Sequence, residues 1–217
     1  MIEAPQVTFS ECVQPTRAVM IVMETSGIGS AVAARLAAQG HLVLIGGRGV
    51  GEAERFAARL RDRGDSAFAA HLDLADPRSV IGFLAAAHYL IGTPDVLITD
   101  VGLVEPSHAD AEGACVGAQT LATRVIPAMV ARGTGDVVLV SPELGGPQCP
   151  TAARKLDAWF EALDAEFVGT GVRASIVRST LPGTVAATDD VGRLVAGMVS
   201  GPRLRLVELL APVAPAS

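Results

Sequence analysis

The stretch Arg17–Arg48, which reads RAVMIVMETSGIGSAVAARLAAQGHLVLIGGR, decides the fold. Its first part, Ala18–Met23, is a short apolar run of the kind found in a parallel strand buried on both faces. Apolar residues then recur at helical spacing over 27–39, and His41–Gly46 is a second apolar run. The stretch therefore predicts a strand, a tight turn that opens a helix, and a second strand.

The turn of this unit has the composition of an anion-binding loop. Gly27 and Gly29 let the backbone approach a ligand closely and let the helix begin near the sheet. The N–H groups at the start of a helix attract negative charge, so a phosphate is a suitable ligand there. Gly40 marks the expected end of the helix.

The same alternation of strand and helix continues along the chain. Further strands are expected at Ser66–His71, Val96–Thr99, Asp136–Ser141, Val172–Val177 and Leu204–Leu210, and further helices at Glu52–Arg63, 77–90, Glu112–Ala131, Thr151–Val168 and Asp190–Ser200. Strict alternation predicts a doubly wound, mostly parallel α/β sheet of seven strands, of the Rossmann type, in a single domain. The expected domain is 17–212, with an N-terminal arm at 1–16 and a tail at 213–217.

Composition limits the classes of function. The chain has 217 residues, half of them apolar, and a net charge of −6, which fits one compact domain and gives no reason to expect nucleic acid. We expect no membrane span and no signal peptide, and therefore a cytoplasmic location. Cys12, Cys115 and Cys149 are odd in number and far apart, so free thiols are expected and no metal site.

One basic residue differs from all the others. Of the 17 lysines and arginines, only Lys155 is a lysine. A position that keeps lysine in an arginine-rich chain indicates a need for a compact ammonium that a guanidinium cannot replace.

With these features in order, the chain resembles the short-chain dehydrogenase/reductase family over nearly its whole length. The motifs that carry the resemblance are SGIG at Ser26–Gly29, GR at Gly47–Arg48, DLAD at Asp73–Asp76, VIPAM at Val125–Met129 and VRASIV at Val172–Val177. The resemblance implies a nicotinamide dinucleotide, NADP, as cofactor, with binding positions at Ser26, Gly27, Ile28, Gly29, Arg48, Asp73, Leu74, Gly102 and Lys155. Arg48 would contact the 2′-phosphate, and Asp73 with the backbone of Leu74 would contact the adenine.

The chain departs from the family at the catalytic positions. The family's tyrosine stands four residues before its lysine, where this chain has Thr151. The family's serine position is occupied by Pro142, with Ser141 beside it, and its asparagine position by Ala114. An aliphatic hydroxyl is a much weaker acid than a phenol, whose pKa is about 10. Lys155 and Ser141 are the remaining candidate catalytic residues.

The cofactor turn and two connections also differ from the family pattern. Met23 replaces the first glycine of the turn, and Glu24 places a carboxylate near the expected phosphates. Thr99–Gly102 stands where the family has Asn-Asn-Ala-Gly. Only eleven residues separate Gly102 from Ala114, and only Val185–Thr188 is left where the family has a lid over the substrate. The sequence thus leaves open whether a nucleotide binds.

These observations support three hypotheses. The first is a non-catalytic or regulatory partner subunit of an active reductase, forming a homo- or hetero-oligomer through the helices near 115–131 and 151–168, with a full-length family member as one partner. The second is an NADP-dependent ketoreductase that acts on a small carbonyl substrate through Lys155 with Ser141. The third is an isomerase or cyclase that uses acid–base or nucleophilic groups at Glu24, Asp100, Glu143 and Cys149.

Overall fold

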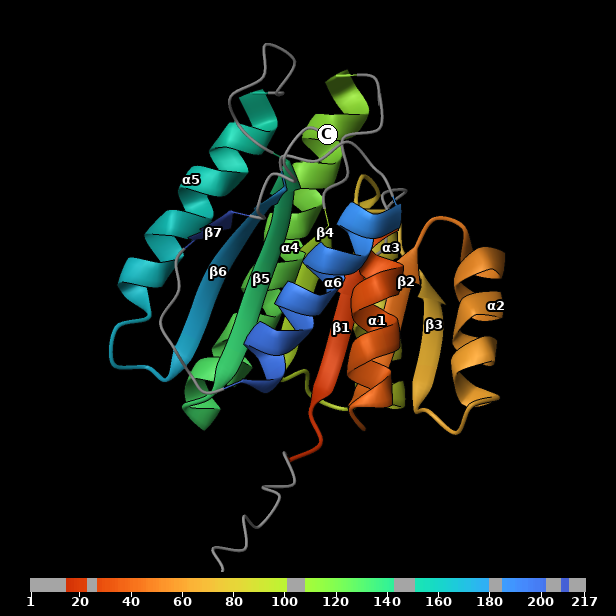
Figure 1. The fold of residues 1–217 in the computed structure, drawn as a ribbon. Helices are drawn as coiled ribbons and strands as arrows, with labels where there is room; N and C mark the ends of the chain where they lie inside the picture. The colour runs from red at the N-terminus through yellow and green to blue at the C-terminus, as the bar shows by residue number, and fades with distance from the viewer. Residues whose placement is uncertain are drawn as a thin grey trace, which may run out of the picture.

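The computed structural model describes residues 15–22, 27–100, 108–142, 151–179, 185–201 and 208–210, which form one parallel sheet with helices on both faces (Figure 1). The strand order is β3-β2-β1-β4-β5-β6-β7. The strands are β1 (Ala18–Val22), β2 (Leu42–Gly47), β3 (Ala67–His71), β4 (Val96–Asp100), β5 (Gly135–Pro142), β6 (Val172–Ser179) and β7 (Glu208–Leu210). The helices are α1 (Ile28–Ala38), α2 (Val50–Arg61), α3 (Pro77–Leu90), α4 (His108–Arg132), α5 (Thr151–Glu166) and α6 (Val185–Ser200).

Strand β1 lies at the point where the strand order reverses. It pairs in parallel with β2 on one side, where Ala18 is opposite Leu42, and with β4 on the other, where Val19 is opposite Val96. Four of its five residues are buried, because helices cover both faces of the sheet. This arrangement confirms the predicted doubly wound parallel α/β domain of the Rossmann type.

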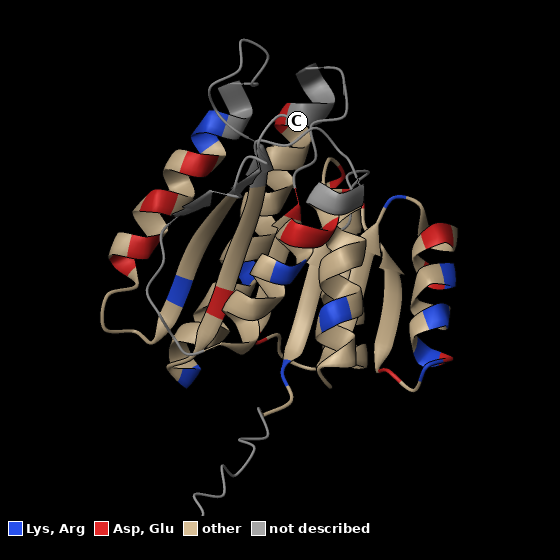
Figure 2. Ribbon diagram, in the orientation of Figure 1, with Lys and Arg blue, Asp and Glu red and all other residues tan. Residues whose placement is uncertain are grey.

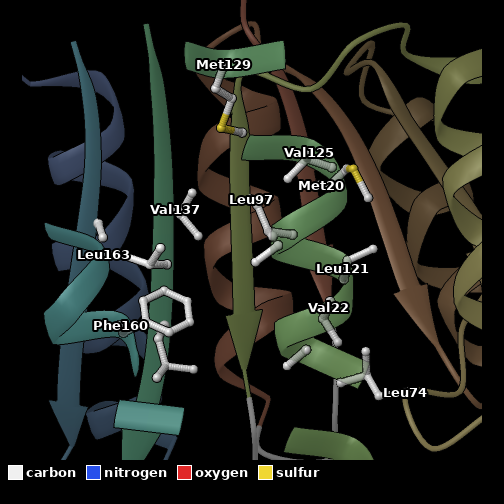
Figure 3. Packing of buried hydrophobic residues seen from close by; sticks show 14 of the residues in the cluster. Met20, Val22, Leu74, Leu97, Leu121, Val125, Met129, Val137, Phe160 and Leu163 are labelled. Atoms are coloured by element: carbon white, nitrogen blue, oxygen red, sulfur yellow. The ribbon is translucent and has the colours of Figure 1, made fainter. Parts of the chain in front are cut away.

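Each face of the sheet has its own apolar core. Helices α1, α2 and α6 cover one face, with Leu36, Leu60 and Val195 among the buried side chains. Helices α3, α4 and α5 cover the other face, where Phe83 and Phe160 are both about 1% exposed. Figure 3 shows side chains of α4 and α5 in this second core, lying over the strands. Burial on both faces explains why the strand segments read as continuous apolar runs.

Strand β7 is the last strand of the sheet, next to β6. Six strands have five to eight residues each, whereas β7 has three, paired with β6 from Ile176 to Arg178. The other residues of the predicted strand 204–210, namely 204–207, lie outside the described part of the chain. The predicted seven-stranded sheet is therefore confirmed, and its seventh strand is described over Glu208–Leu210 alone.

Three helices begin earlier than their sequence pattern indicated. Helix α2 starts at Val50 and not at Glu52, and α6 and α4 have longer extensions. Helix α6 starts at Val185 and not at Asp190, so Val185–Thr188 is the first turn of a helix and not a short connection. Helix α4 starts at His108 and not at Glu112. Both extensions follow from good helix formers such as Ala186, Ala187 and Ala109, which need no apolar periodicity to continue a helix.

Helix α4 is the only helix in the described ranges that is long and apolar enough for a membrane span, over Glu112–Arg132. We had expected none from the sequence. Leu121, Ala122, Val125 and Met129 of this helix are buried against the sheet. A core helix passes the same test of length and composition, so the finding alone does not indicate a membrane.

A network of ion pairs and hydrogen bonds joins several elements at the end of the sheet where the strands begin. The carboxylate of Asp136 on β5 is about 2% exposed and lies 2.5 Å from both Arg17, before β1, and Arg173, on β6. Arg173 makes a hydrogen bond through Nε to Oδ1, whereas the contact of Arg17 with Oδ2 is an ion pair without hydrogen-bond alignment. The two guanidinium groups also donate to the carbonyl oxygens of Val199 and Met198 at the end of α6. Three strands and one helix are thus joined at this edge.

Outside this network, charges of both signs are distributed over the outer helices. Figure 2 shows lysines and arginines mixed with acidic residues on α2, and several acidic residues along α5. Charges of both signs thus lie on the same outer helices in this view.

Glycines on α4 hold the turn after β3 close to that helix. A Cβ atom on Gly117 would lie 1.9 Å from the carbonyl oxygen of Leu74, and one on Gly113 would lie 3.1 Å from Cβ of Ala75. The backbones meet there with no room for a side chain. This contact fixes the position of the turn that carries Asp73 relative to α4.

We predict that Gly117→Ala destabilises the protein by about 1–3 kcal/mol, because the added methyl group forces α4 away from the backbone of Leu74. Gly82→Ala on α3 is the matched control, since a Cβ at Gly82 meets nothing within 4 Å. The control should be neutral or stabilising by up to about 1 kcal/mol through helix propensity. Urea unfolding of both variants measures the difference, and equal effects would contradict the close contact.

Candidate functional site

The candidate site lies at the edge of the sheet where the strands end. Because all strands run in parallel, the carboxyl ends of β1, β2, β4, β5 and β6 lie at this one edge. The helices that follow these strands begin there, with their N-termini near the ends of the strands (Figure 1). In open parallel sheets, ligands bind at such an edge beside the reversal of strand order, here between β1 and β4.

The glycine turn has the predicted backbone geometry where the structure describes it. Gly27 has φ of 75° and ψ of −11°, in the left-handed region that favours glycine, and it immediately precedes α1. Its carbonyl oxygen accepts the backbone N–H of Ala31 at 3.1 Å. A Cβ at Gly27 would lie 3.6 Å from Cγ2 of Thr188 on α6. The turn is therefore close to the first turn of α6, which sequence reasoning had missed.

The other predicted residues of the turn differ in what the structure describes. Ile28 is half-buried and Gly29 is buried at the start of α1. Ser26, Met23 and Glu24 lie outside the described residues. The close approach of this helix to the sheet at Gly27 and Gly29 stays a prediction.

Helix α6 is fixed against α1 beside this turn. Arg35 on α1 forms an ion pair with Asp189 on α6 at 2.7 Å, and Arg193 donates to the same carboxylate at 3.3 Å. The hydrogen bond from Arg35 holds the pKa of Asp189 below its usual value. A Cβ at Gly192 would lie 2.7 Å from that of Ala31, so the two helices are in close backbone contact. The sequence analysis missed this contact because it placed the start of α6 at Asp190. The apolar periodicity of the helix begins only after its first turn.

The positions predicted for adenosine lie after β2 and β3. Arg48 is exposed directly after β2. The carboxylate of Asp73 accepts the backbone N–H of Ala75 at 2.9 Å, and the N–H of Asp73 donates to Ser79 Oγ at 2.8 Å. Leu74 is buried. Asp73 therefore shapes its own turn, whether or not it also contacts a nucleotide.

The catalytic candidates lie at the end of β5 and the start of α5. Lys155 is exposed on α5, one turn after Thr151, the first residue of that helix. Ser141 and Pro142 are the last two residues of β5, paired with Arg178 and Ser179 of β6. The side chains at 141, 142 and 151 lie outside the described part. The topology thus brings the candidates Lys155 and Ser141 to the same edge of the sheet.

The end of β4 carries two buried polar residues. Asp100 is about 2% exposed, and Thr99 is fully buried with no hydrogen-bond partner for its Oγ1. Thr99 stands where the resemblance places an asparagine. A hydroxyl cannot reproduce the separate donor and acceptor of an amide, so the substitution leaves a buried polar atom unsatisfied.

The remaining predicted residues are only partly within the described ranges. Gly102, Glu24, Glu143 and Cys149 lie outside them, as does Cys12. Cys115 is a buried free thiol on α4. Within the described ranges, no group of three or more His, Cys, Asp or Glu residues could hold a metal ion.

The chain's one tyrosine lies far from this edge. Tyr89 is 88% exposed and stands near the end of α3, whose last residue is Leu90. Since α3 returns from the end of β3 to the start of β4 at Val96, Tyr89 lies at the opposite edge of the sheet. The fold therefore places this phenol away from the candidate site.

A model of the short chain dehydrogenase family matches residues 17–194. The chain belongs to this family. Glycine betaine reductase ATRR of Emericella nidulans is 30% identical over 184 residues, which are 77% of this chain and 14% of that protein. Ketoacyl reductase HetN of Nostoc sp. is 25% identical over 204 residues, which are 87% of this chain and 69% of that protein. The chain thus spans about one seventh of the first of these relatives.

Solved structures of the family share the fold. Actinorhodin polyketide ketoreductase, crystallised with NADPH, superposes with a TM-score of 0.79 at 20% identity, over 90% of this chain and 95% of that one. At this identity the likeness establishes the fold alone. The chain is thus an α/β domain of an oxidoreductase family, as the sequence motifs indicated.

The described residues fit part of a dinucleotide. The left-handed Gly27 before α1 and the exposed Arg48 after β2 suit a phosphate and a second anionic group. Lys155 is exposed on the first turns of α5, the helix that begins at the same edge. These residues would hold the nucleotide, which in this family supplies a hydride.

We predict that Asp73→Ala lowers the free energy of unfolding by about 1 kcal/mol in the absence of nucleotide, because the N–H of Ala75 loses its acceptor. Asp73→Asn is the matched control, since its amide oxygen can accept the same hydrogen bond. Thermal unfolding should give a lower melting temperature for Asp73→Ala and little change for Asp73→Asn. A stable Asp73→Ala variant would show that the carboxylate does not support the turn.

Proposed function

We propose that this chain is a member of the short-chain dehydrogenase family without the family's proton-transfer chemistry, and that it serves as a structural or regulatory partner subunit of an active reductase. One observation carries this proposal. The only tyrosine, Tyr89, is 88% exposed near the end of α3, at the edge of the sheet opposite to the candidate site. The family's chemistry requires a phenol beside the nicotinamide.

Other groups in the chain are poor substitutes for that phenol. The hydroxyl of Thr151 is far less acidic than a phenol, so the nearby ammonium of Lys155 has no group of suitable pKa to activate. Ala114, at the family's asparagine position, is half-buried on α4 and has no polar atom in its side chain. Proton transfer through these positions is therefore unfavourable.

The helices of the expected subunit contact are both present. Helices α4 and α5 pack beside each other on one face of the sheet. Helix α4 exposes two large apolar side chains, Val116 at 56% and Val130 at 38%. Helix α5 exposes the small residues Ala158, Ala162 and Ala165, which permit close approach of another helix. These features support pairing through 115–131 and 151–168, with a second copy or with a full-length family member.

An NADP-dependent ketoreductase is the second candidate. It is favoured by Lys155, the single lysine, which is exposed at the candidate site. HetN is described as a ketoacyl reductase, and the actinorhodin enzyme is a ketoreductase with bound NADPH. In this case Lys155 would bind the nucleotide, and Ser141 would polarise the carbonyl of a small substrate. A cytoplasmic location is proposed for both candidates.

For the partner subunit, we predict no NADPH oxidation with ketoacyl or cyclic ketone substrates and no saturable binding of NADPH or NADH by calorimetry. Turnover is not expected because the proton donor is missing. Binding is not expected because the carboxylate of Glu24 is predicted near the phosphates and would repel them, which would outweigh the contacts of Arg48 and Lys155.

Saturable binding with turnover would contradict the partner-subunit proposal. If Lys155→Ala then abolished turnover while Arg154→Ala, its exposed neighbour on α5, did not, the ketoreductase would be established.

We also predict that Val116→Arg on α4 dissociates the oligomer, because a charged side chain would be buried in the contact. Light scattering of the purified chain gives the molar mass of a homo-oligomer. Co-purification after co-expression with a full-length reductase of the family tests for a hetero-oligomer. Ile81→Arg on α3 is the matched control, since Ile81 is 63% exposed on a helix outside the proposed contact. A monomer in both experiments, or equal loss with both variants, would contradict pairing through α4.

A further inference from the structure

His41 is a buried titratable residue that takes no part in the candidate site. It stands between Gly40 and β2, at the edge where the strands begin, and it is about 1% exposed. Histidine changes its charge near neutral pH, so a buried histidine in a network of hydrogen bonds is a candidate for a pH-sensitive contact.

The contacts of the imidazole fit one neutral tautomer. The backbone N–H of Arg17 donates to Nδ1 at 3.3 Å, so Nδ1 is an acceptor. Nε2 lies 3.1 Å from Ser200 Oγ, and this hydroxyl donates to Gln39 Oε1 at 2.6 Å. Nε2 therefore carries the proton and donates to the serine. All three bonds are satisfied only when the ring is neutral.

A second proton would disrupt this arrangement. Protonated Nδ1 would be a donor that faces the N–H of Arg17, which is also a donor. Burial lowers the pKa of His41 and the charge of Arg17 lowers it further, whereas Asp95 raises it. Among the neighbours, α1 and α6 contribute the neutral Gln39 and Ser200. Asp95 is itself paired with Arg132 at 3.2 Å.

The hydrogen bonds of His41 act on the end of α6. Ser200 is the last residue of that helix. The two preceding carbonyl groups, of Met198 and Val199, accept from Arg173 and Arg17. The end of α6 is thus held by two guanidinium groups, whose charge does not vary near neutral pH, and by one imidazole, whose charge does.

We propose that His41 is a pH-sensitive latch, which in its neutral form links the end of α6 to the start of β1. Because both nitrogens of an imidazolium are donors, protonation breaks the contact with the N–H of Arg17 directly and releases Ser200 only through the displacement of the ring that this repulsion forces. The lowered pKa gives the direction of the effect. At a pH above the ordinary histidine pKa of about 6.5, the latch contributes its full stabilisation. This stabilisation is lost as the pH falls toward the lower pKa of His41 in the folded protein. The two arginine contacts remain, so the release is local.

Hydrogen exchange of the full-length protein, measured by mass spectrometry at about pH 7.5 and about pH 5.5, tests the latch. With labelling times corrected for the intrinsic effect of pH, peptides covering 195–201 should lose protection at the lower pH, while peptides of α3 should not. His41→Gln should remove this pH dependence. His88→Gln is the matched control, because His88 is exposed on α3 and should leave the pH dependence unchanged.

Ser200→Ala provides a second test that keeps the titrating group. It removes the acceptor for Nε2–H, so the end of α6 should already lose protection at neutral pH, even if His41→Gln does not fold. Equal protection of 195–201 at both pH values in the unmodified protein would overturn the proposal. The same pH dependence in His41→Gln, or a loss of protection spread over the whole chain, would overturn it as well.

Discussion

The reversal of strand order between β1 and β4 is the constraint on which the rest of the structure depends. Strand β1 pairs in parallel with β2 on one side and with β4 on the other. The chain therefore builds the sheet outward from β1 in both directions, and the connecting helices lie on both faces. These crossovers force every strand to end at the same edge. The candidate site is therefore a consequence of topology. It exists wherever this strand order exists, independently of which side chains occupy it.

The two edges of the sheet have different physical roles. At the edge where strands begin, the carboxylate of Asp136 joins Arg17 and Arg173, and these reach the end of α6. A buried ion pair adds little net stability over an apolar replacement, but loss of one partner leaves an unpaired buried charge. The network therefore selects one arrangement of β1, β5, β6 and α6. The opposite edge carries the candidate site, beside which Arg35 and Asp189 form an ion pair between α1 and α6.

The sequence predicted the fold better than the site. Apolar runs such as Val96–Thr99 must be buried on both faces of a parallel sheet, so their pattern alone indicates the architecture. The early start of α6 at Val185 was missed, because its first turn packs near Gly27 through Thr188 and has no apolar periodicity. The contacts of His41 with Ser200 could not be predicted either, since they join residues 159 positions apart. Periodicity reports which face a residue occupies, whereas a polar contact depends on which elements the fold brings together.

The described contacts that position the elements around the candidate site do not involve the catalytic positions. The turn after β3 is fixed by the backbone of Leu74 against Gly117, and the start of α1 is fixed by Gly27 and by the ion pair of Arg35 with Asp189. None of these contacts needs a phenol, a catalytic serine or an asparagine. Under the proposed function, replacement of those three groups removes proton transfer at little cost to folding. A chain of this family can lose its chemistry and keep the surfaces of α4 and α5, and this independence of packing from chemistry makes a partner subunit physically reasonable.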